Sequence, residues 1–144
     1  MTIKPKAIIC DLDGTLALLG DRSPYDASSC EDDLLNAPIA HILEVYAHQT
    51  LHDIKLILLS GREDKYRKPT ENWLKKHNIT HYEALYMRKT GDKRKDTIIK
   101  KELYKKYIEN IYDILFVLDD RDQVVDMWRK DLGLTCLQVA YGNF

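Results

Sequence analysis

Short apolar runs alternate with helical patterns along the whole chain of 144 residues. Five of these runs have the length of a buried strand: Ala7–Leu12, Ile54–Leu59, Tyr82–Met87, Ile114–Leu118 and Thr135–Val139. Strands that alternate with helices favour a parallel sheet that is covered by helices on both faces. The sequence therefore predicts an α/β, Rossmann-like fold with a central parallel sheet of about five strands.

The segments between the runs each carry one apolar face at helical spacing. The first such helix follows Pro38, the second opens at Pro69, and the third runs from about Asp96 to Tyr107. The fourth places Trp128 on its inner face and stops near Gly133, because glycine is the residue that most often ends a helix. Four helices are therefore expected around the sheet.

Composition limits the class of protein. With 44% hydrophobic and 31% charged residues, the chain is predicted to form a single globular domain over residues 1–144. Its apolar runs are too short for a membrane span or a secretory signal. The three cysteines, Cys10, Cys30 and Cys136, show no metal-binding spacing, and free thiols in a cytoplasmic protein are the better interpretation.

Charge is unevenly distributed along the chain. Residues 61–110 contain 15 basic and 8 acidic side chains, a net charge of +7, whereas the segments on either side are net acidic. A basic segment suits a polyanionic partner such as nucleic acid, but it is also what a solvated, lysine-rich helix face looks like. Charge alone favours the solvated face.

Polar residues follow four of the five apolar runs. Parallel strands bring such residues to one edge of a sheet, outside the carboxyl ends of the strands. Asp11 and Asp13 lie at the end of the first run, Ser60, Gly61 and Arg62 follow the second, Arg88, Asp92 and Lys95 follow the third, and Asp119, Asp120 and Arg121 follow the fourth. The Asp13-Gly14 pair is also a hairpin-turn signal, but the common position of the four clusters favours a functional site.

The carboxylates in these clusters predict a metal site. Asp11, Asp13, Asp119 and Asp120 offer oxygen ligands of the kind that Mg²⁺ prefers. Beside a metal that screens their charge, Asp11 would attack phosphorus to form an aspartyl phosphate. Asp13 would protonate the leaving oxygen and later activate water. The predicted chemistry is phosphoryl transfer.

Groups that could bind a phosphorylated substrate are expected at the same edge. Ser60 and Lys95 would bind phosphate oxygens, and Gly61 would allow close approach of the backbone. Three arginines could hold further phosphate or sugar oxygens: Arg62, Arg88 and Arg121. The sequence has neither the G-x-G-x-x-G pattern of dinucleotide-binding domains nor a Walker A sequence, so no nicotinamide, flavin or kinase signature is present.

The order of D-x-D-G-T, a serine at a strand end, a lysine and a D-D pair resembles the haloacid-dehalogenase (HAD) phosphatase superfamily. The stretches GDRSPYD, SGRE, GDKRKD and LDDRDQVVDMWR more closely resemble the 3′-phosphatase domain of phage-type polynucleotide kinase/phosphatases, over a likeness from Ala7 to Phe144. This resemblance implies Asp11 as nucleophile, Asp13 as general acid and base, Ser60 and Lys95 as phosphate ligands, and Asp119 with Asp120 as the acidic metal pair. It also implies that Arg22 and the other arginines help bind substrate, and that Asp92 supports Lys95 or an arginine.

The resemblance implies a magnesium-dependent polynucleotide 3′-phosphatase that acts on DNA or RNA ends in nucleic acid repair. Only about twenty residues separate Thr15 from the next helix, too few for a full cap domain, so an open site is expected. Phage-type enzymes join this domain to a P-loop kinase that this sequence lacks, which predicts a stand-alone enzyme or one with a separate kinase or ligase partner. Tyr25 and Tyr86 are candidates for contact with a nucleobase.

Two alternatives remain open at this stage. A HAD phosphatase could instead act on free nucleotides or other small phosphomonoesters. A module that keeps the fold could bind nucleic acid without catalysis, although such a module would be expected to lose Asp11 or Asp13, and both are present.

Overall fold

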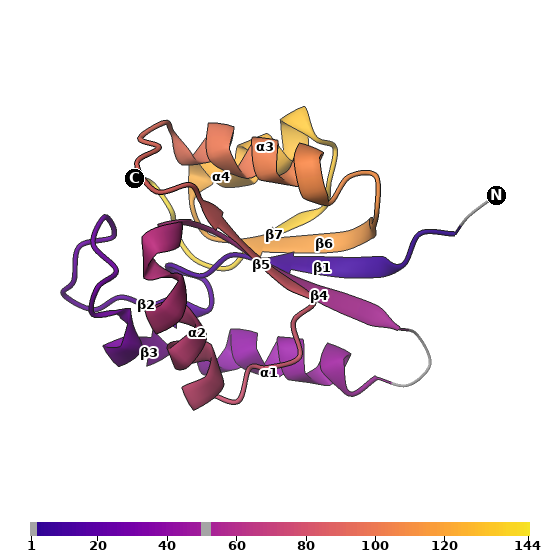
Figure 1. Ribbon diagram of the computed structural model, residues 1–144. Coiled ribbons are helices and arrows are strands. Elements are labelled where there is room, and N and C mark those ends of the chain that lie inside the picture. The colour runs from indigo at the N-terminus through magenta and orange to yellow at the C-terminus, as the bar shows by residue number, and fades with distance from the viewer. Residues whose placement is uncertain (1–2, 50–52) are drawn as a thin grey trace.

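The computed structural model describes residues 3–49 and 53–144, and its centre is a five-stranded sheet (Figure 1). The strand order is β5-β4-β1-β6-β7. These strands are β1 (Lys6–Cys10), β4 (Ile54–Glu63), β5 (Ala84–Arg88), β6 (Asp113–Asp119) and β7 (Cys136–Gln138). All four pairings between them are parallel, so the predicted fold class is confirmed.

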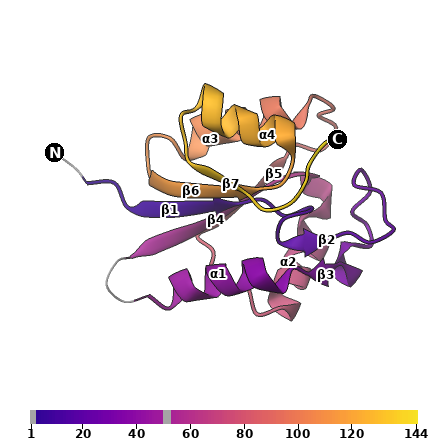
Figure 2. The ribbon, with the colours of Figure 1, turned by 180° about the vertical axis from the view of Figure 1, so that it is seen from behind.

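Helices cover both faces of the sheet (Figures 1 and 2). On one face lie α1 (Ala37–Ala47) and α2 (Arg67–Lys76), and on the other lie α3 (Asp96–Tyr107) and α4 (Asp122–Asp126). A π-helical turn, Met127–Asp131, continues α4. The four predicted helices are present.

The core consists of two apolar layers, one on each side of the sheet. Successive strand residues face opposite sides, so Ile9 of β1 packs in the layer with α3 and α4, whereas Cys10 packs in the layer with α1 and α2. Trp73 and Trp128 are fully buried, one in each layer. Both tryptophans therefore belong to the core, as predicted, and the three cysteines are free and buried.

A short excursion separates β1 from α1. It contains the antiparallel pair β2 (Ala17–Leu18) and β3 (Leu34–Leu35) and a 3-10 helix, Cys30–Asp32, and no larger inserted element within the described residues. A second 3-10 helix, Asp64–Tyr66, precedes α2. Across residues 3–49 and 53–144, no helix has both the length and the apolar character needed to cross a membrane.

The first strand ends two residues earlier than the sequence predicts. After Cys10 the chain folds into a tight turn in which the carbonyl of Leu12 accepts hydrogen bonds from the amides of Thr15, Leu16 and Ala17. Gly14 in this turn has a φ of 83°, a conformation that glycine adopts without steric cost. The turn places both aspartates of the D-x-D pair beyond the sheet edge.

Candidate active site at the carboxyl edge of the sheet

A cavity of about 260 Å³ lies at the edge of the sheet where the parallel strands end. Nine residues predicted for the site line it: Asp11, Asp13, Gly61, Arg62, Arg88, Asp92, Asp119, Asp120 and Arg121. They lie at the carboxyl ends of four different strands, or just after them, and these strands lie apart in the sequence. The sheet topology brings them together because parallel strands all end at the same edge.

Three buried carboxylates meet in this cavity. One oxygen each from Asp11, Asp119 and Asp120 lies within 4.8 Å of the other two. Burial and the neighbouring Asp119 raise the pKa of Asp11 well above its usual value, and the same two causes raise the pKa of Asp120. Ionised carboxylates held this closely need compensating positive charge.

Part of that charge comes from Lys100, a residue absent from the predicted site. Its Nζ donates to Asp11 Oδ1 at 2.8 Å and to Asp119 Oδ2 at 3.0 Å. Burial alone would lower the pKa of Lys100, but the carboxylates of Asp11 and Asp119 raise it overall. The buried ammonium of Lys100 is therefore held in its charged form and fixes both carboxylates.

The charge that remains fits a hard divalent cation. One ammonium beside three ionised carboxylates leaves two negative charges uncompensated, and all the available ligand atoms are oxygens. Thr15 Oγ1 donates to Asp11 Oδ2 at 2.8 Å and orients that carboxylate. A Cβ at Gly14 would lie 2.2 Å from Asp120 Oδ2, so only glycine allows the backbone to pass this close. Asp11, Asp119 and Asp120 are the side chains that would hold the ion.

The carboxylate of Asp13 lies in a different cluster, contrary to its predicted role as a metal ligand. Its Oδ1 accepts hydrogen bonds from Arg62 Nη2 at 2.7 Å and from Arg22 Nη2 at 2.9 Å. The buried carboxylate of Asp33 accepts hydrogen bonds from the same two arginines, from Arg22 Nε at 2.8 Å and from Arg62 Nη2 at 3.1 Å. Two guanidinium groups thus balance two carboxylates beside the group formed by Asp11, Asp119 and Asp120, and Asp33 is a site residue that the sequence analysis missed.

A second missed residue, Asp96, connects the remaining arginines. Its carboxylate accepts hydrogen bonds from Arg88 Nη2 and, at 3.2 Å, from Arg121 Nη1. Arg88 Nε also donates to the carbonyl of Gly61 at 2.7 Å. A Cβ at Gly61 would lie 2.6 Å from Asp96 Oδ1, which explains why glycine occupies this position. Asp96 therefore orients the guanidinium groups of Arg88 and Arg121, and both arginines line the cavity.

Two predicted phosphate ligands lie outside the cavity lining. Ser60 is buried, and its Oγ accepts a hydrogen bond from the Arg62 amide at 3.1 Å. Lys95 is exposed at the start of α3 and does not line the cavity, whereas Lys100, in the second turn of the helix, is buried against the carboxylates. The structure thus corrects the prediction for Lys95, because the turn of α3 brings Lys100 to the site instead.

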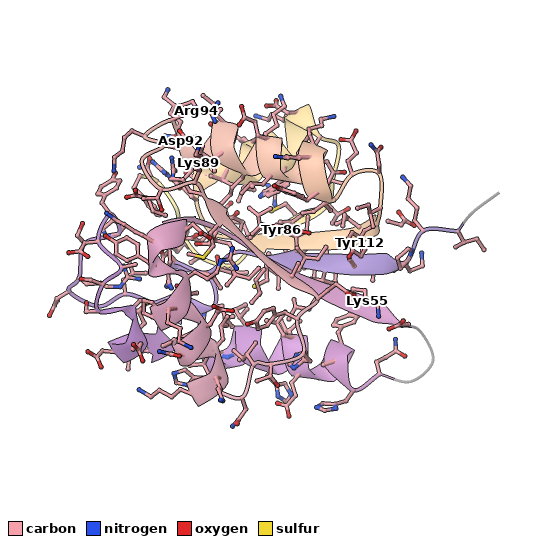
Figure 3. The ribbon with its side chains drawn as sticks, viewed as in Figure 1. Lys55, Tyr86, Lys89, Asp92, Arg94 and Tyr112 are labelled. Atoms are coloured by element: carbon pink, nitrogen blue, oxygen red, sulfur yellow. The ribbon has the colours of Figure 1, made fainter. Side chains whose placement is uncertain are left out.

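Asp92 lies in the loop that follows β5, close to Arg94 (Figure 3). Arg94 Nη2 donates to Asp92 Oδ2 at 2.8 Å, and hydrogen bonds from Arg94 lower the pKa of Asp92 to about 2. The carbonyl of Asp92 accepts a hydrogen bond from Arg88 Nη1 at 3.0 Å. Asp92 is thus joined to two arginines and not to Lys95.

Comparison with known proteins gives a family match over almost the whole chain. A family model described as the polynucleotide kinase PNKP phosphatase domain matches residues 5–144. A protein of Autographa californica nuclear polyhedrosis virus, named "Putative bifunctional polynucleotide kinase/RNA ligase", is 37% identical over 126 residues. That alignment covers 87% of this chain and 18% of the viral protein.

Several solved structures are also similar to this chain. A chain in the structure of a Pnkp1/Rnl/Hen1 complex is 56% identical, with a TM-score of 0.95, over 100% of this chain and 49% of that one. A chain of the Pnkp1/Rnl/Hen1 RNA repair complex is also 56% identical, with a TM-score of 0.94, over 98% of this chain and 44% of that one. A class C acid phosphatase from Bacillus anthracis shares the fold, with a TM-score of 0.61 at 17% identity over 99% of this chain and 68% of its own. This chain therefore spans less than half the length of its closely similar relatives.

Proposed function

This chain belongs to the family of PNKP phosphatase domains, and we propose that it is a magnesium-dependent phosphatase that removes the terminal 3′-phosphate from RNA ends. The observation that carries the proposal is the buried group of Asp11, Asp119 and Asp120, joined by Lys100, in a cavity lined by arginines. Such a site can hold a phosphate and a cation together. Mg²⁺, when bound to the three carboxylates, would offset the charge of the phosphate.

Asp11 is the proposed nucleophile. Lys100 donates to its Oδ1 and Thr15 to its Oδ2, so the carboxylate is held in one orientation at the cavity. One of its oxygens would form a bond to phosphorus while the bond from phosphorus to the 3′-oxygen breaks, which gives a phospho-aspartyl intermediate. Arg62 and Arg88, which line the cavity, would stabilise the charge on the phosphate oxygens.

Asp13 is the proposed general acid and base. Arg22 and Arg62 both donate to its Oδ1, whereas its Oδ2 accepts no hydrogen bond from the described residues and is available for proton transfer. It would give a proton to the departing 3′-oxygen and then take one from the water that attacks the aspartyl phosphate. Hydrolysis restores the carboxylate of Asp11 and releases inorganic phosphate.

A panel of four substrates tests this proposal in the presence of Mg²⁺. The panel consists of a 3′-phosphorylated RNA oligonucleotide, its DNA counterpart, the same RNA with a 5′-phosphate, and the free 3′-mononucleotide. The proposed function requires the highest kcat/KM on the RNA 3′-phosphate. Equal values on all four substrates would contradict a polynucleotide assignment and favour a phosphatase of small phosphomonoesters, whereas phosphate release from none of them would favour a binding module.

Removal of divalent cations is expected to stop phosphate release, and added Mg²⁺ should restore it. Without the ion, Lys100 is the cation that contacts this group of carboxylates, and their remaining negative charge would repel the phosphate dianion. Because an ion that binds only the folded state stabilises it, Mg²⁺ should also raise the Tm. Asp120→Asn should lose both effects, while the exposed control Asp126→Asn should keep them. An activity that survives chelation would contradict the metal assignment.

Trp128 is expected to position one metal ligand. Its Nε1 donates to Asp119 Oδ2 at 3.1 Å, the oxygen that also accepts from Lys100. Trp128→Phe removes this hydrogen bond and keeps an aromatic ring, so we expect about ten-fold weaker activation by Mg²⁺, the size typical of changes around a metal ligand. A Mg²⁺ titration of phosphate release measures this effect. Tyr104→Phe is the control, because the centroid of the Tyr104 ring lies 5.9 Å from that of the Trp128 ring. An unchanged titration midpoint in Trp128→Phe would show that Asp119 does not depend on the bond.

The names of the relatives support RNA ends and a set of partner activities. Two similar chains come from Pnkp1/Rnl/Hen1 complexes, one of them described as an RNA repair complex, and the viral relative is named as both a kinase and an RNA ligase. We therefore propose that this phosphatase unit works in the cytoplasm together with a polynucleotide kinase and an RNA ligase. Light scattering of the protein co-expressed with such a ligase would test for a stable complex.

A further inference from the structure

An aromatic side chain lies open at the wall of the catalytic cavity. Tyr25 is 84% exposed, and together with Pro24 and Ala27 it lines the cavity that contains Asp11. Large aromatic side chains usually bury their rings in a core or an interface. An open ring beside a phosphate-binding cavity is therefore a candidate contact for an apolar part of the substrate.

The loop that carries Tyr25 is held in place by the catalytic cluster itself. Arg22 Nη1 donates to the carbonyls of Ser23 at 3.1 Å and Asp26 at 3.4 Å, while Nη2 of the same guanidinium binds Asp13. The amide of Tyr25 donates to Ser23 Oγ at 3.1 Å. The backbone of Tyr25 is thus fixed relative to Asp13, although its ring is open to solvent.

A second contact secures the far side of the loop. Asp26 Oδ1 accepts a hydrogen bond from the Ser28 amide at 3.0 Å and from the hydroxyl of Tyr66 at 3.5 Å. Tyr66 lies at the end of the 3-10 helix before α2 and also lines the cavity. The loop therefore bridges the D-x-D turn and the segment after β4, and a ring mounted on it is pre-positioned for binding.

The other tyrosine considered from the sequence, Tyr86, has a different environment. Its ring stacks on that of Tyr107, with centroids 4.8 Å apart and an angle of 7° between the planes. In Figure 3 Tyr86 lies along the sheet, away from the loop that carries Asp92 and Arg94. One face of Tyr86 is already covered by protein and it does not line the cavity, so Tyr25 is the better platform for a ligand.

We infer that Tyr25 stacks on the base of the nucleotide that carries the 3′-phosphate, and so makes the site prefer nucleotide ends to other phosphomonoesters. This inference rests on the proposed function. Tyr25 and Pro24 line the same cavity as Asp11, so a nucleoside attached to a phosphate at Asp11 would lie in a cavity whose lining includes the Tyr25 ring. Stacking suits any base because every base presents an apolar face, so this contact adds affinity without reading sequence.

The test compares two RNA oligonucleotides that differ only at the 3′-phosphorylated residue, which carries a base in one and is abasic in the other. Wild-type protein should have a kcat/KM about ten-fold higher for the end with the base, the size expected for one stacked base. Tyr25→Ala should lose this ratio, and Tyr25→Phe should keep it because the ring is retained. Tyr141→Ala is the matched control, since the Tyr141 side chain is exposed like that of Tyr25 but does not line the cavity.

The outcomes separate this inference from the function on which it rests. Wild-type protein that releases no phosphate from either end would overturn the proposed function, and the inference with it. Wild-type protein that is active but treats both ends equally would overturn the stacking inference alone. So would a Tyr25→Ala variant that retains the ten-fold ratio, or a Tyr141→Ala variant that loses it.

Discussion

Replacing Asp11 by asparagine is expected to reduce phosphate release by at least about 10⁴-fold, because the amide cannot form the aspartyl phosphate. The Asn side chain has nearly the same size, so substrate should still bind. Rapid-quench experiments with a ³²P-labelled 3′-phosphate should trap labelled wild-type protein and no labelled Asp11→Asn protein. Asp21→Asn, which alters an exposed carboxylate outside the cavity lining, is the matched control and should retain both turnover and labelling.

The same variant should keep its fold. In the native protein, burial and the neighbouring Asp119 raise the pKa of Asp11, so the ionised form of Asp11 is unfavourable to the folded state at neutral pH. A neutral amide removes this cost, and without metal the Tm of Asp11→Asn should equal or exceed that of wild type. This is the usual relation between stability and a catalytic group held in an unfavourable environment. Activity that persists in the folded variant would exclude the covalent mechanism.

The fold could be predicted from the sequence because each element has a clear apolar pattern. The third helix was predicted with the bounds that the structure gives, Asp96–Tyr107. Strand ends were less predictable: β4 continues to Glu63, past the predicted end at Leu59. A shift in register against β5 between Ser60 and Glu63 produces this extension, and such an irregularity leaves no mark in an apolar pattern.

The carboxylates of the site were predictable because they directly follow strands. Asp33 was not, since it ends the acidic stretch 31–33, where nothing in the sequence distinguishes it from its exposed neighbours Glu31 and Asp32. Its burial depends on Arg22 and Arg62, which reach it from other parts of the chain. Pairings between residues that are distant in sequence are decided by tertiary structure.

The lysine of the site was misplaced for a reason that helix geometry explains. Lys95 precedes α3, so the helical period does not fix its direction, and several lysines and arginines surround it in the sequence. Lys100 lies four residues before Tyr104, and residues at this spacing share one face of a helix. Both are buried, so the spacing of Lys100 from the apolar face was the signal that could have identified it.

Lys100→Met is expected to lower kcat by at least about 10²-fold, because the ammonium that orients Asp11 and supports charge in the transition state is lost. It should also destabilise the fold by about 3–5 kcal/mol, the usual cost of removing one partner from a buried ion pair. Asp11 and Asp119 would then lie buried without their cation. Steady-state kinetics and denaturant unfolding, each with and without Mg²⁺, measure the two effects.

Lys95→Met is the control that distinguishes the structural assignment from the expectation based on sequence. Its side chain is exposed and lies outside the cavity lining, so kcat should stay close to that of wild type. The free energy of unfolding should change by no more than about 0.5 kcal/mol. Mg²⁺ should restore part of the stability of Lys100→Met, because it supplies positive charge to the same carboxylates, but it should leave Lys95→Met unaffected. If Lys95→Met instead lost activity while Lys100→Met kept it, Lys95 would be the lysine that acts on the phosphate, and the ion pairs of Lys100 would serve stability alone.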